Sequence, residues 1–176
     1  MKLLTRSIAL AAAFSASTVD AEPSAPKPEL EYAFTVKVDV APPVEMGPAD
    51  GGRKRFIAIT GGTFTGPALS GTVLPGGGDW QVIEDGGLTR LEARYFLKAA
   101  DGTVIEVTNI GVRVATAEVT EKLAKGEAVD PSAYYFRTTP IFNVTAGKLD
   151  WMRRSTFVAR GIRKPGEVLV DVYRVK

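Results

Sequence analysis

The sequence predicts an all-β domain, either an antiparallel barrel or a sandwich. Apolar and polar residues alternate with a period of two along many short segments, which is the pattern of half-buried strands. Glycine-rich turns separate these segments at fairly regular spacing. Only one segment has helical spacing, so the strand–helix–strand rhythm of a parallel sheet is absent. A chain of 176 residues is long enough for one such domain with its own apolar core.

The first 21 residues have the three parts of a secretory signal peptide. Lys2 and Arg6 form a short positive region, residues 7–19 are uncharged and rich in alanine, and the small residue Ala21 precedes the expected cut. An uncharged run of 13 residues is too short to span a membrane, which takes roughly 20 residues. No cysteine follows the cut, which excludes a lipoprotein anchor. We therefore expect a periplasmic or secreted protein without a stable membrane anchor.

A single folded domain is expected over residues 30–176. Residues 22–29 contain three prolines and are predicted to form an extended leader before that domain. A loop rich in proline and glycine is predicted over residues 42–52, and Gly61 and Gly62 are expected to end the strand that follows it. The predicted strands cover residues 34–40, 53–60, 63–74, 79–84, 88–99, 103–112, 134–144, 155–161 and 168–175.

One short helix is predicted over residues 117–125. Val119 and Leu123 lie four residues apart, Thr116 is a candidate N-cap, and a glycine follows the last turn. A further turn of helix is expected near residues 150–152. Together with eight to ten strands joined mostly by glycine turns, this pattern favours a barrel or sandwich over other architectures.

An outer-membrane barrel is the alternative architecture. Such a barrel needs a lipid-facing apolar band between two aromatic girdles. The aromatic residues of this chain are not paired at strand ends, and its last residue is Lys176 rather than an aromatic one. Both observations argue against that alternative.

The residue types that are missing exclude several kinds of chemistry. The chain has no histidine and no cysteine, which excludes Ser–His–Asp and Cys–His catalysis and removes the usual ligands of zinc, iron–sulfur and haem sites. We therefore expect no metal and no cofactor. The 22 basic and 20 acidic residues give a net charge of +2, which offers no reason to expect a nucleic-acid partner. Catalysis must then use Asp, Glu, Arg, Lys, Tyr, Ser or Thr.

Several strings of residues, taken in order, resemble one protein family. They are GGTFTGPALSGTVLPGGGDWQ, LEARYFLKAADGTVIEVTNIG, YYFRTTPIF, WMRRSTFVARG and the closing VDVYRVK. Their order and spacing resemble the domain-of-unknown-function family 3237, a bacterial and fungal group, from about Leu30 to the C-terminus. The resemblance implies a small, calycin-like antiparallel β-barrel and no single function. Glu92 stands where the family commonly has Asp, and Met152-Arg153 stands where it commonly has Leu-Asn.

Two acidic residues are candidate proton-transfer groups. Asp79 follows a Pro-Gly-Gly-Gly turn, whose glycines let the backbone approach a ligand closely, and Trp80 beside it could stack on a ring. Glu92 shares a strand face with Arg94. In the alternative interpretation, Asp79 caps its turn, Trp80 fills the barrel end, and Glu92 and Arg94 lie on the solvated outer face. A cross-strand pair of Arg94 with Glu106 is also possible.

Three further residues are candidate ligand contacts. Tyr135 and Arg137 share a strand face, and a guanidinium can bind a carboxylate with two hydrogen bonds. Trp151 would add apolar surface to a pocket. The alternatives are a structural acid that pairs with Arg137 and a Trp151 that plugs the barrel. Arg53 and Arg55 are expected to be solvated charges beside the long loop.

Three classes of function stay open at this point, and so does the oligomeric state. The first is binding of a small, partly apolar, anionic or phenolic ligand, with Arg94 and Arg137 supplying charge. The second is a lyase, isomerase or cyclase without metal or cofactor that uses Asp79 or Glu92 as base. The third is a structural envelope protein without a pocket. An enclosed cavity containing a carboxylate with a raised pKa would favour the enzyme.

Overall fold

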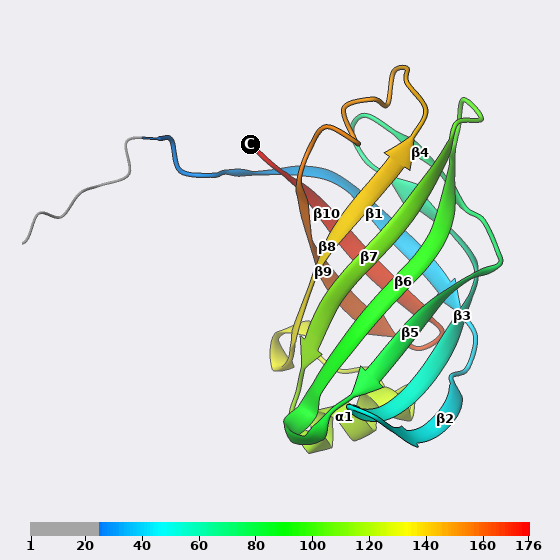
Figure 1. Ribbon diagram of the computed structural model, residues 1–176, viewed down its shortest axis with the longest axis vertical. Coiled ribbons are helices and arrows are strands. Elements are labelled where there is room, and N and C mark those ends of the chain that lie inside the picture. Colours follow the sequence, from blue (N-terminus) through cyan, green and yellow to red (C-terminus); the bar gives the residue numbers. More distant parts are fainter. Residues whose placement is uncertain (1–24) are drawn as a thin grey trace, which may run out of the picture.

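The computed structural model describes residues 25–176, so the predicted signal peptide and the first residues of the leader lie outside the described part. Ten strands and one α-helix follow one another along the chain (Figure 1). The strands are β1 (Leu30–Val40), β2 (Val44–Ala49), β3 (Gly52–Thr65), β4 (Ser70–Val73), β5 (Gly77–Ile83), β6 (Leu88–Ala99), β7 (Val104–Val114), β8 (Tyr135–Val144), β9 (Phe157–Lys164) and β10 (Glu167–Val175). The helix α1 spans Ala117–Ala124, and the single 3₁₀ turns η1 (Asp85–Gly87) and η2 (Pro131–Ala133) precede β6 and β8.

Eight of the strands close an antiparallel barrel. They pair in the order β1–β10–β9–β8–β7–β6–β5–β3, and β3 pairs again with β1. The other two strands extend this wall: β2 pairs with the first half of β3, and β4 lies between the ends of β3 and β6. The predicted antiparallel barrel of eight to ten strands with one short helix is thus confirmed.

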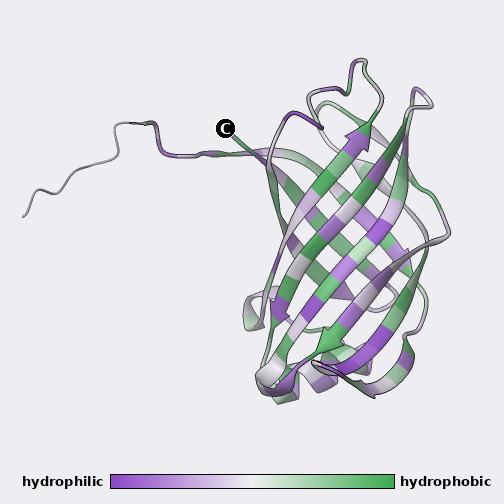
Figure 2. Cartoon of the chain, in the orientation of Figure 1, coloured by the Kyte–Doolittle hydropathy of each residue, from purple (hydrophilic) through white to green (hydrophobic). Residues whose placement is uncertain are grey.

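Alternating side chains separate the interior of the barrel from its surface. Figure 2 shows hydrophobic and hydrophilic residues following each other along the strands. On β6, Leu91, Tyr95 and Leu97 are buried, whereas Arg94 and Phe96 between them are exposed. A strand in a closed barrel has one face in the interior and one in water, so the period of two in the sequence is what this fold requires.

One half of the interior is a packed apolar core, which we call the apolar half. It lies toward the end that carries the β6–β7 and β8–β9 connections, at the top of Figure 1. Its fully buried side chains include Phe34, Phe64, Leu97, Ile105, Val107, Met152, Phe157 and Val172. Phe34 makes edge-to-face contacts with Phe64 and Phe142, with ring centroids 6.0 and 5.6 Å apart. This half has the dense packing that stabilises a folded domain.

The opposite end of the barrel is covered by the segment between β7 and β8, which contains α1. Leu123 of the helix packs with Leu91, Tyr134 and Phe136 of the barrel wall. Thr116 caps the helix by accepting a hydrogen bond of 3.2 Å from the backbone N–H of Val119, as the sequence predicts. Within residues 25–176, no helix is long and apolar enough to cross a membrane.

Three local predictions are wrong. The strand β2 forms inside the predicted loop of residues 42–52, because this segment lies along β3 and pairs with it. The strand β3 continues through Gly61 and Gly62, where a Cβ on Gly62 would collide with the backbone carbonyl of Lys37 on β1. The two glycines therefore allow close strand approach rather than ending the strand. Residues 150–152 form successive turns instead of a turn of helix.

Candidate functional site

The second half of the interior, next to α1, is polar. Inward-facing positions on six strands supply its hydrogen-bonding and charged side chains. This polar half consists of Arg55, Asp79, Gln81, Thr89, Asn109, Arg113, Thr138 and Arg163. A cavity of about 50 Å³ lies among them, bordered by Asp79, Asn109 and Arg113. One water needs roughly 10–15 Å³, so the cavity has room for a few waters or for one end of a small molecule.

Strand register explains why these side chains meet. Asp79 on β5 lies opposite Ala93 on β6, which in turn lies opposite Asn109 on β7. In the next layer toward α1, Gln81 lies opposite Arg55 on β3. The small side chain of Ala93 leaves space between Asp79 and Asn109, and this space is part of the cavity.

A hydrogen-bonded chain holds Asp79 in place. Arg55, only 5% exposed, donates from Nε to Oε1 of Gln81 at 2.8 Å, and Nε2 of Gln81 donates to Oδ2 of Asp79. This orientation of the Gln81 amide follows from its charged neighbours, because a guanidinium only donates and a carboxylate only accepts. Glu45 on β2 approaches Arg55 to 3.9 Å from the outside. Asp79 is therefore positioned by two residues of the neighbouring layer.

The other oxygen of Asp79 faces the interior without a partner. Its Oδ1 atom is inaccessible to solvent and accepts no hydrogen bond from the described residues. Burial raises the pKa of Asp79 to about 6, although the hydrogen bond from Gln81 and the positive charges of Arg55 and Arg113 lower it. Both protonation states are therefore populated near neutral pH, which is the property a general acid or base needs.

Arg113 is a buried cation with little compensation. It is 3% exposed, and its hydrogen bond to Oγ1 of Thr89 is long, at 3.4 Å. Burial, together with the like charges of Arg55 and Arg163, lowers the pKa of Arg113 to about 10. No carboxylate within residues 25–176 approaches this guanidinium to 4.0 Å. Its charge thus lacks the partner that a buried ion normally has.

The remaining polar groups divide into satisfied and unsatisfied ones. Arg163 donates to the backbone carbonyls of Lys164 and Glu167 at 3.0 and 3.1 Å. In contrast, Oδ1 of Asn109 and Oγ1 of Thr138 are buried and have no hydrogen-bond partner among the described residues. Buried polar atoms are usually paired, so unpaired ones around a cavity indicate a place for water or a ligand.

The described residues contain no group of three or more His, Cys, Asp or Glu that could hold a metal. The polar half itself has three guanidinium groups and a single carboxylate, that of Asp79. Such a set can bind an anion and transfer a proton.

Comparison with known proteins places the chain in a family. The family described as "Protein of unknown function (DUF3237)" matches residues 28–175. This chain belongs to that family. The resemblance seen in the sequence is therefore confirmed, and it covers nearly all of the predicted mature domain.

Relatives of this DUF3237 protein are similar over nearly their whole length. It is 37% identical over 150 residues to the UPF0311 protein RPA1785 of Rhodopseudomonas palustris, which covers 85% of this chain and 98% of the relative. The crystal structure of RPA1785, a conserved protein of unknown function, matches 86% of this chain and 100% of that chain with a TM-score of 0.83. A more distant relative is the hydroalkoxylation enzyme phnH of Penicillium herquei, 31% identical over 97 residues, or 55% of this chain and 63% of that protein.

In this DUF3237 barrel, Asp79 is the predicted site residue that lies in the polar half. It neither caps its turn nor lies at the barrel mouth. Glu92 and Arg94 lie on the outer face, where Nη2 of Arg94 pairs with Oε1 of Glu92 at 2.5 Å. The suggested pair of Arg94 with Glu106 does not form, because Glu106 lies opposite Phe96 on β6. Glu92 is therefore not an interior base, and Arg94 supplies no charge to the interior.

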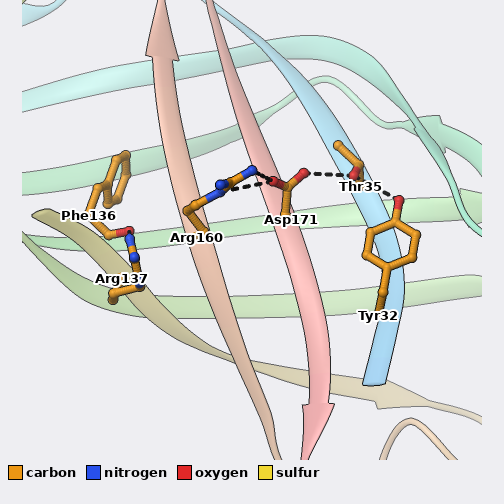
Figure 3. Close-up of polar contacts among 6 residues, drawn as sticks. All are labelled: Tyr32, Thr35, Phe136, Arg137, Arg160 and Asp171. Carbon is orange, nitrogen blue, oxygen red and sulfur yellow. Dashed lines mark hydrogen bonds and ion pairs between the residues drawn. The ribbon is translucent and has the colours of Figure 1, made fainter. Parts of the chain in front are cut away.

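The predicted ligand contacts also lie outside the polar half. Trp80 is 48% exposed and packs on Phe56 across the outer wall, so it does not fill the barrel end. The guanidinium of Arg137 lies 5.1 Å from the ring centroid of Tyr135. It also donates to the backbone carbonyl of Phe136 at 3.0 Å (Figure 3). These residues lie on the surface of the barrel and do not face its interior.

A structural acid does exist two strands away from Arg137, but it pairs with another arginine. On the neighbouring strands, Nη2 of Arg160 pairs with Oδ2 of Asp171 at 2.6 Å (Figure 3). The other carboxylate oxygen of Asp171 accepts from the hydroxyl of Thr35, which is hydrogen-bonded in turn to Tyr32. This chain of contacts braces β1, β10 and β9 on the outer surface.

Four of the predicted residues do lie together, in a groove on the outer wall. The groove has a volume of about 990 Å³. Its lining includes Trp80, Glu92, Tyr135 and Arg137, and also Arg55, Gln81 and Thr138 of the polar half. Trp151 is far from it: its ring packs against Phe157 at 5.8 Å and closes the apolar half. For Trp151, the plugging role is thus the one observed.

Sequence reasoning missed several residues of the polar half. Arg55 was expected to be solvated, yet it is buried because it continues the inward series of Ile57 and Ile59 on β3. Asn109 and Arg113 likewise continue the inward series on β7. The signal available in the sequence was a polar residue on a strand face whose other residues are apolar. Such a residue is costly to bury, so several of them at inward positions predict a polar interior.

Proposed function

We propose that this protein is an exported β-barrel enzyme that binds a small, partly apolar, acidic molecule in the polar half and transfers a proton through Asp79. The reaction would belong to the lyase, isomerase or cyclase classes and would need neither metal nor cofactor. The observation that carries this proposal is the enclosed, unpartnered Oδ1 of Asp79 beside a cavity. A carboxylate whose pKa is about 6 can both accept and return a proton near neutral pH.

A structural role and a purely ligand-binding role explain fewer features of the barrel interior than an enzyme does. A barrel with a purely structural role would be filled throughout, as the apolar half is. A protein that only binds a ligand has no need for a carboxylate whose pKa lies near neutrality. Perturbed carboxylates in cavities are common at catalytic sites, because burial tunes them for proton transfer. The enzyme is therefore the function that we favour, with ligand binding in the same cavity as its first step.

The relative phnH, a hydroalkoxylation enzyme, supports the proposal of proton-transfer catalysis. Hydroalkoxylation adds the O–H bond of an alcohol across a carbon–carbon multiple bond. The oxygen forms a bond to one carbon and loses its proton, while the other carbon gains a proton. An acid–base residue can carry out both transfers without a metal. We propose that the DUF3237 barrel described here catalyses a proton transfer of this general kind on a substrate of its own.

The first experiment compares the wild type with Asp79→Asn. Both proteins are incubated with a small-molecule extract of the native host, and the extract is analysed by liquid chromatography and mass spectrometry. We expect the wild type to convert a compound, and Asp79→Asn to bind that compound but convert it roughly 10²–10⁴-fold more slowly. Glu92→Gln, which alters the outer carboxylate, is the control and should match the wild type. Equal conversion by Asp79→Asn, or no conversion by the wild type, would contradict the proposal.

Export is proposed from the N-terminal pattern of a positive start, an uncharged run and a small residue at the cut. The intact mass of the protein recovered from the periplasm or medium of its host is expected to lack residues 1–21. A recovered mass that retains them would count against export.

A further inference from the structure

We propose that Arg113 is the anion-binding residue of the polar half and that the substrate is a hydroxy acid. The carboxylate of this substrate would pair with Arg113, and its hydroxyl would donate to Oδ1 of Asp79. This inference rests on the proposed function, because it assumes that the interior is the site, and it adds the substrate class.

The first argument is the unused bonding capacity of Arg113. A guanidinium has five N–H donors in a planar fork that matches a carboxylate. In Arg113 this group is almost completely buried and makes one long hydrogen bond, to the hydroxyl of Thr89. A buried ion without a counter-ion lowers the stability of the folded state. An anionic ligand would supply the counter-ion that Arg113 lacks, which gives a reason for the protein to keep this buried charge.

The second argument is that the other two guanidiniums nearby are occupied. Arg55 is engaged by Gln81 at 2.8 Å and by Glu45 at 3.9 Å. Arg163 is engaged by two backbone carbonyls. Both belong to the local framework, so Arg113 is the guanidinium of the polar half that remains available to a ligand.

The third argument comes from the acceptors on the same cavity. Asp79 and Asn109 line it together with Arg113, and each has a buried Oδ1 without a hydrogen-bond donor among the described residues. An acceptor is satisfied only by a group that carries a hydrogen. The occupant must therefore present both an anion, for Arg113, and an O–H, for Asp79 or Asn109.

The size and lining of the cavity restrict this occupant further. The cavity volume of about 50 Å³ admits a few non-hydrogen atoms, so either a very small hydroxy acid or the hydroxy-acid end of a larger molecule fits. Apolar side chains, including Val38, Leu91 and Phe136, complete the lining. They match the partly apolar body that the proposed function requires. A bound carboxylate would also bring the charge of the polar half closer to balance.

The test uses glycolate, which carries a carboxylate and a hydroxyl on adjacent carbons. Binding is measured by calorimetry and by the rise in unfolding temperature, with acetate, ethylene glycol and inorganic phosphate as comparison probes. Three variants of the full mature chain are compared with the wild type. Arg113→Met removes the proposed anion site, Arg137→Met removes an outer arginine on the neighbouring strand, and Ala93→Leu fills the cavity.

We expect glycolate to bind the wild type and Arg137→Met equally, and to bind Arg113→Met at least tenfold more weakly. Without any probe, Arg113→Met should unfold at the same temperature as the wild type or above it, because an uncompensated buried charge has been removed. Arg113→Lys, which keeps the charge but loses the fork, should bind glycolate with intermediate affinity. Acetate should bind more weakly than glycolate, and ethylene glycol more weakly still.

Several results would overturn the inference, and they point to different failures. If binding is lost in Ala93→Leu but unchanged in Arg113→Met, Arg113 is not the anion-binding residue, whereas the proposal that the interior is the functional site still holds. Binding that is insensitive to Ala93→Leu would contradict the interior site itself. Phosphate binding as tightly as glycolate would indicate an inorganic anion site. No glycolate binding, or a large drop in the unfolding temperature of Arg113→Met without probe, would also contradict the hydroxy-acid site.

Discussion

The same strands build the two halves of the barrel interior, yet the halves differ in how completely their buried groups are packed and hydrogen-bonded. In the apolar half, Phe34 contacts Phe64 and Phe142 edge to face, and the three rings fill the space. In the polar half, buried oxygens of Asp79 and Thr138 have no partner among the described residues, and a cavity remains. We infer from this comparison that the apolar half stabilises the fold. The polar half lowers the folding stability, because it keeps the unpaired buried groups that the proposed reaction would use.

If this division holds, the largest effect of a single substitution should come from the apolar half. Phe34→Ala removes a fully buried ring that contacts two other phenylalanines. We expect the free energy of unfolding to fall by about 3–5 kcal/mol, through lost apolar burial and the cavity left behind. Denaturant titration followed by circular dichroism measures this change. A loss below about 1 kcal/mol would show that this half is not the stabilising one.

The next effect should have the opposite sign and depend on pH. The pKa of Asp79 is raised from 3.8 to about 6 in the folded protein, so the unfolded chain releases this proton first as the pH rises. Between about pH 4 and 6, the ionisation of Asp79 therefore lowers the stability of the wild type, and Asp79→Asn lacks this contribution because it cannot ionise. A difference of about two pKa units corresponds to roughly 3 kcal/mol, by which Asp79→Asn should be the more stable protein at pH 7.

Unfolding free energies measured from pH 3.5 to 7.5 test this expectation. The two proteins should converge at the acidic end, where Asp79 is protonated in both the folded and unfolded states. Glu92→Gln is the matched control on the outer surface: it retains Asp79 and should follow the wild type across this pH range. A wild type that is more stable than Asp79→Asn at pH 7 would mean that Asp79 stabilises the folded state when it is charged.

The smallest of these effects should come from Thr138. Its hydroxyl is buried without a hydrogen-bond partner among the described residues, and Thr138→Val replaces it by a methyl group of similar size. Removing an unsatisfied polar group should raise the free energy of unfolding by about 1 kcal/mol. Chemical denaturation of the apo protein is the measurement. A clear destabilisation would indicate that water or another group satisfies this hydroxyl, which would weaken the contrast between the halves.

Much of the fold could be predicted because its signals are local. The strand predicted over residues 88–99 coincides with β6, since its alternation is unbroken and turns flank it. The helix and its cap at Thr116 were also recognisable. The missed strand β2 carries no such signal: Pro48 and Gly47 read as a loop, and only pairing with β3 makes the segment a strand.

The site was harder to predict, because alternation separates two faces without saying which one is interior. On β6 the apolar set is inside and the charged pair of Glu92 and Arg94 is outside. On β5 this is reversed, since Trp80 faces water while Asp79 and Gln81 face the interior. A rule that places aromatic residues inside and charges outside succeeds on the first strand and fails on the second.

By itself, the sequence determined the all-β class, most strand positions, and an interior chemistry without histidine or cysteine. Only the tertiary structure decided that Arg55, Asp79 and Arg113, which come from three different strands, come near one another in the polar half of the interior. The physical reason is that burial and electrostatic coupling are not local. The pKa of Asp79 depends on the desolvation that arises when the barrel closes, and on charges that only closure brings near.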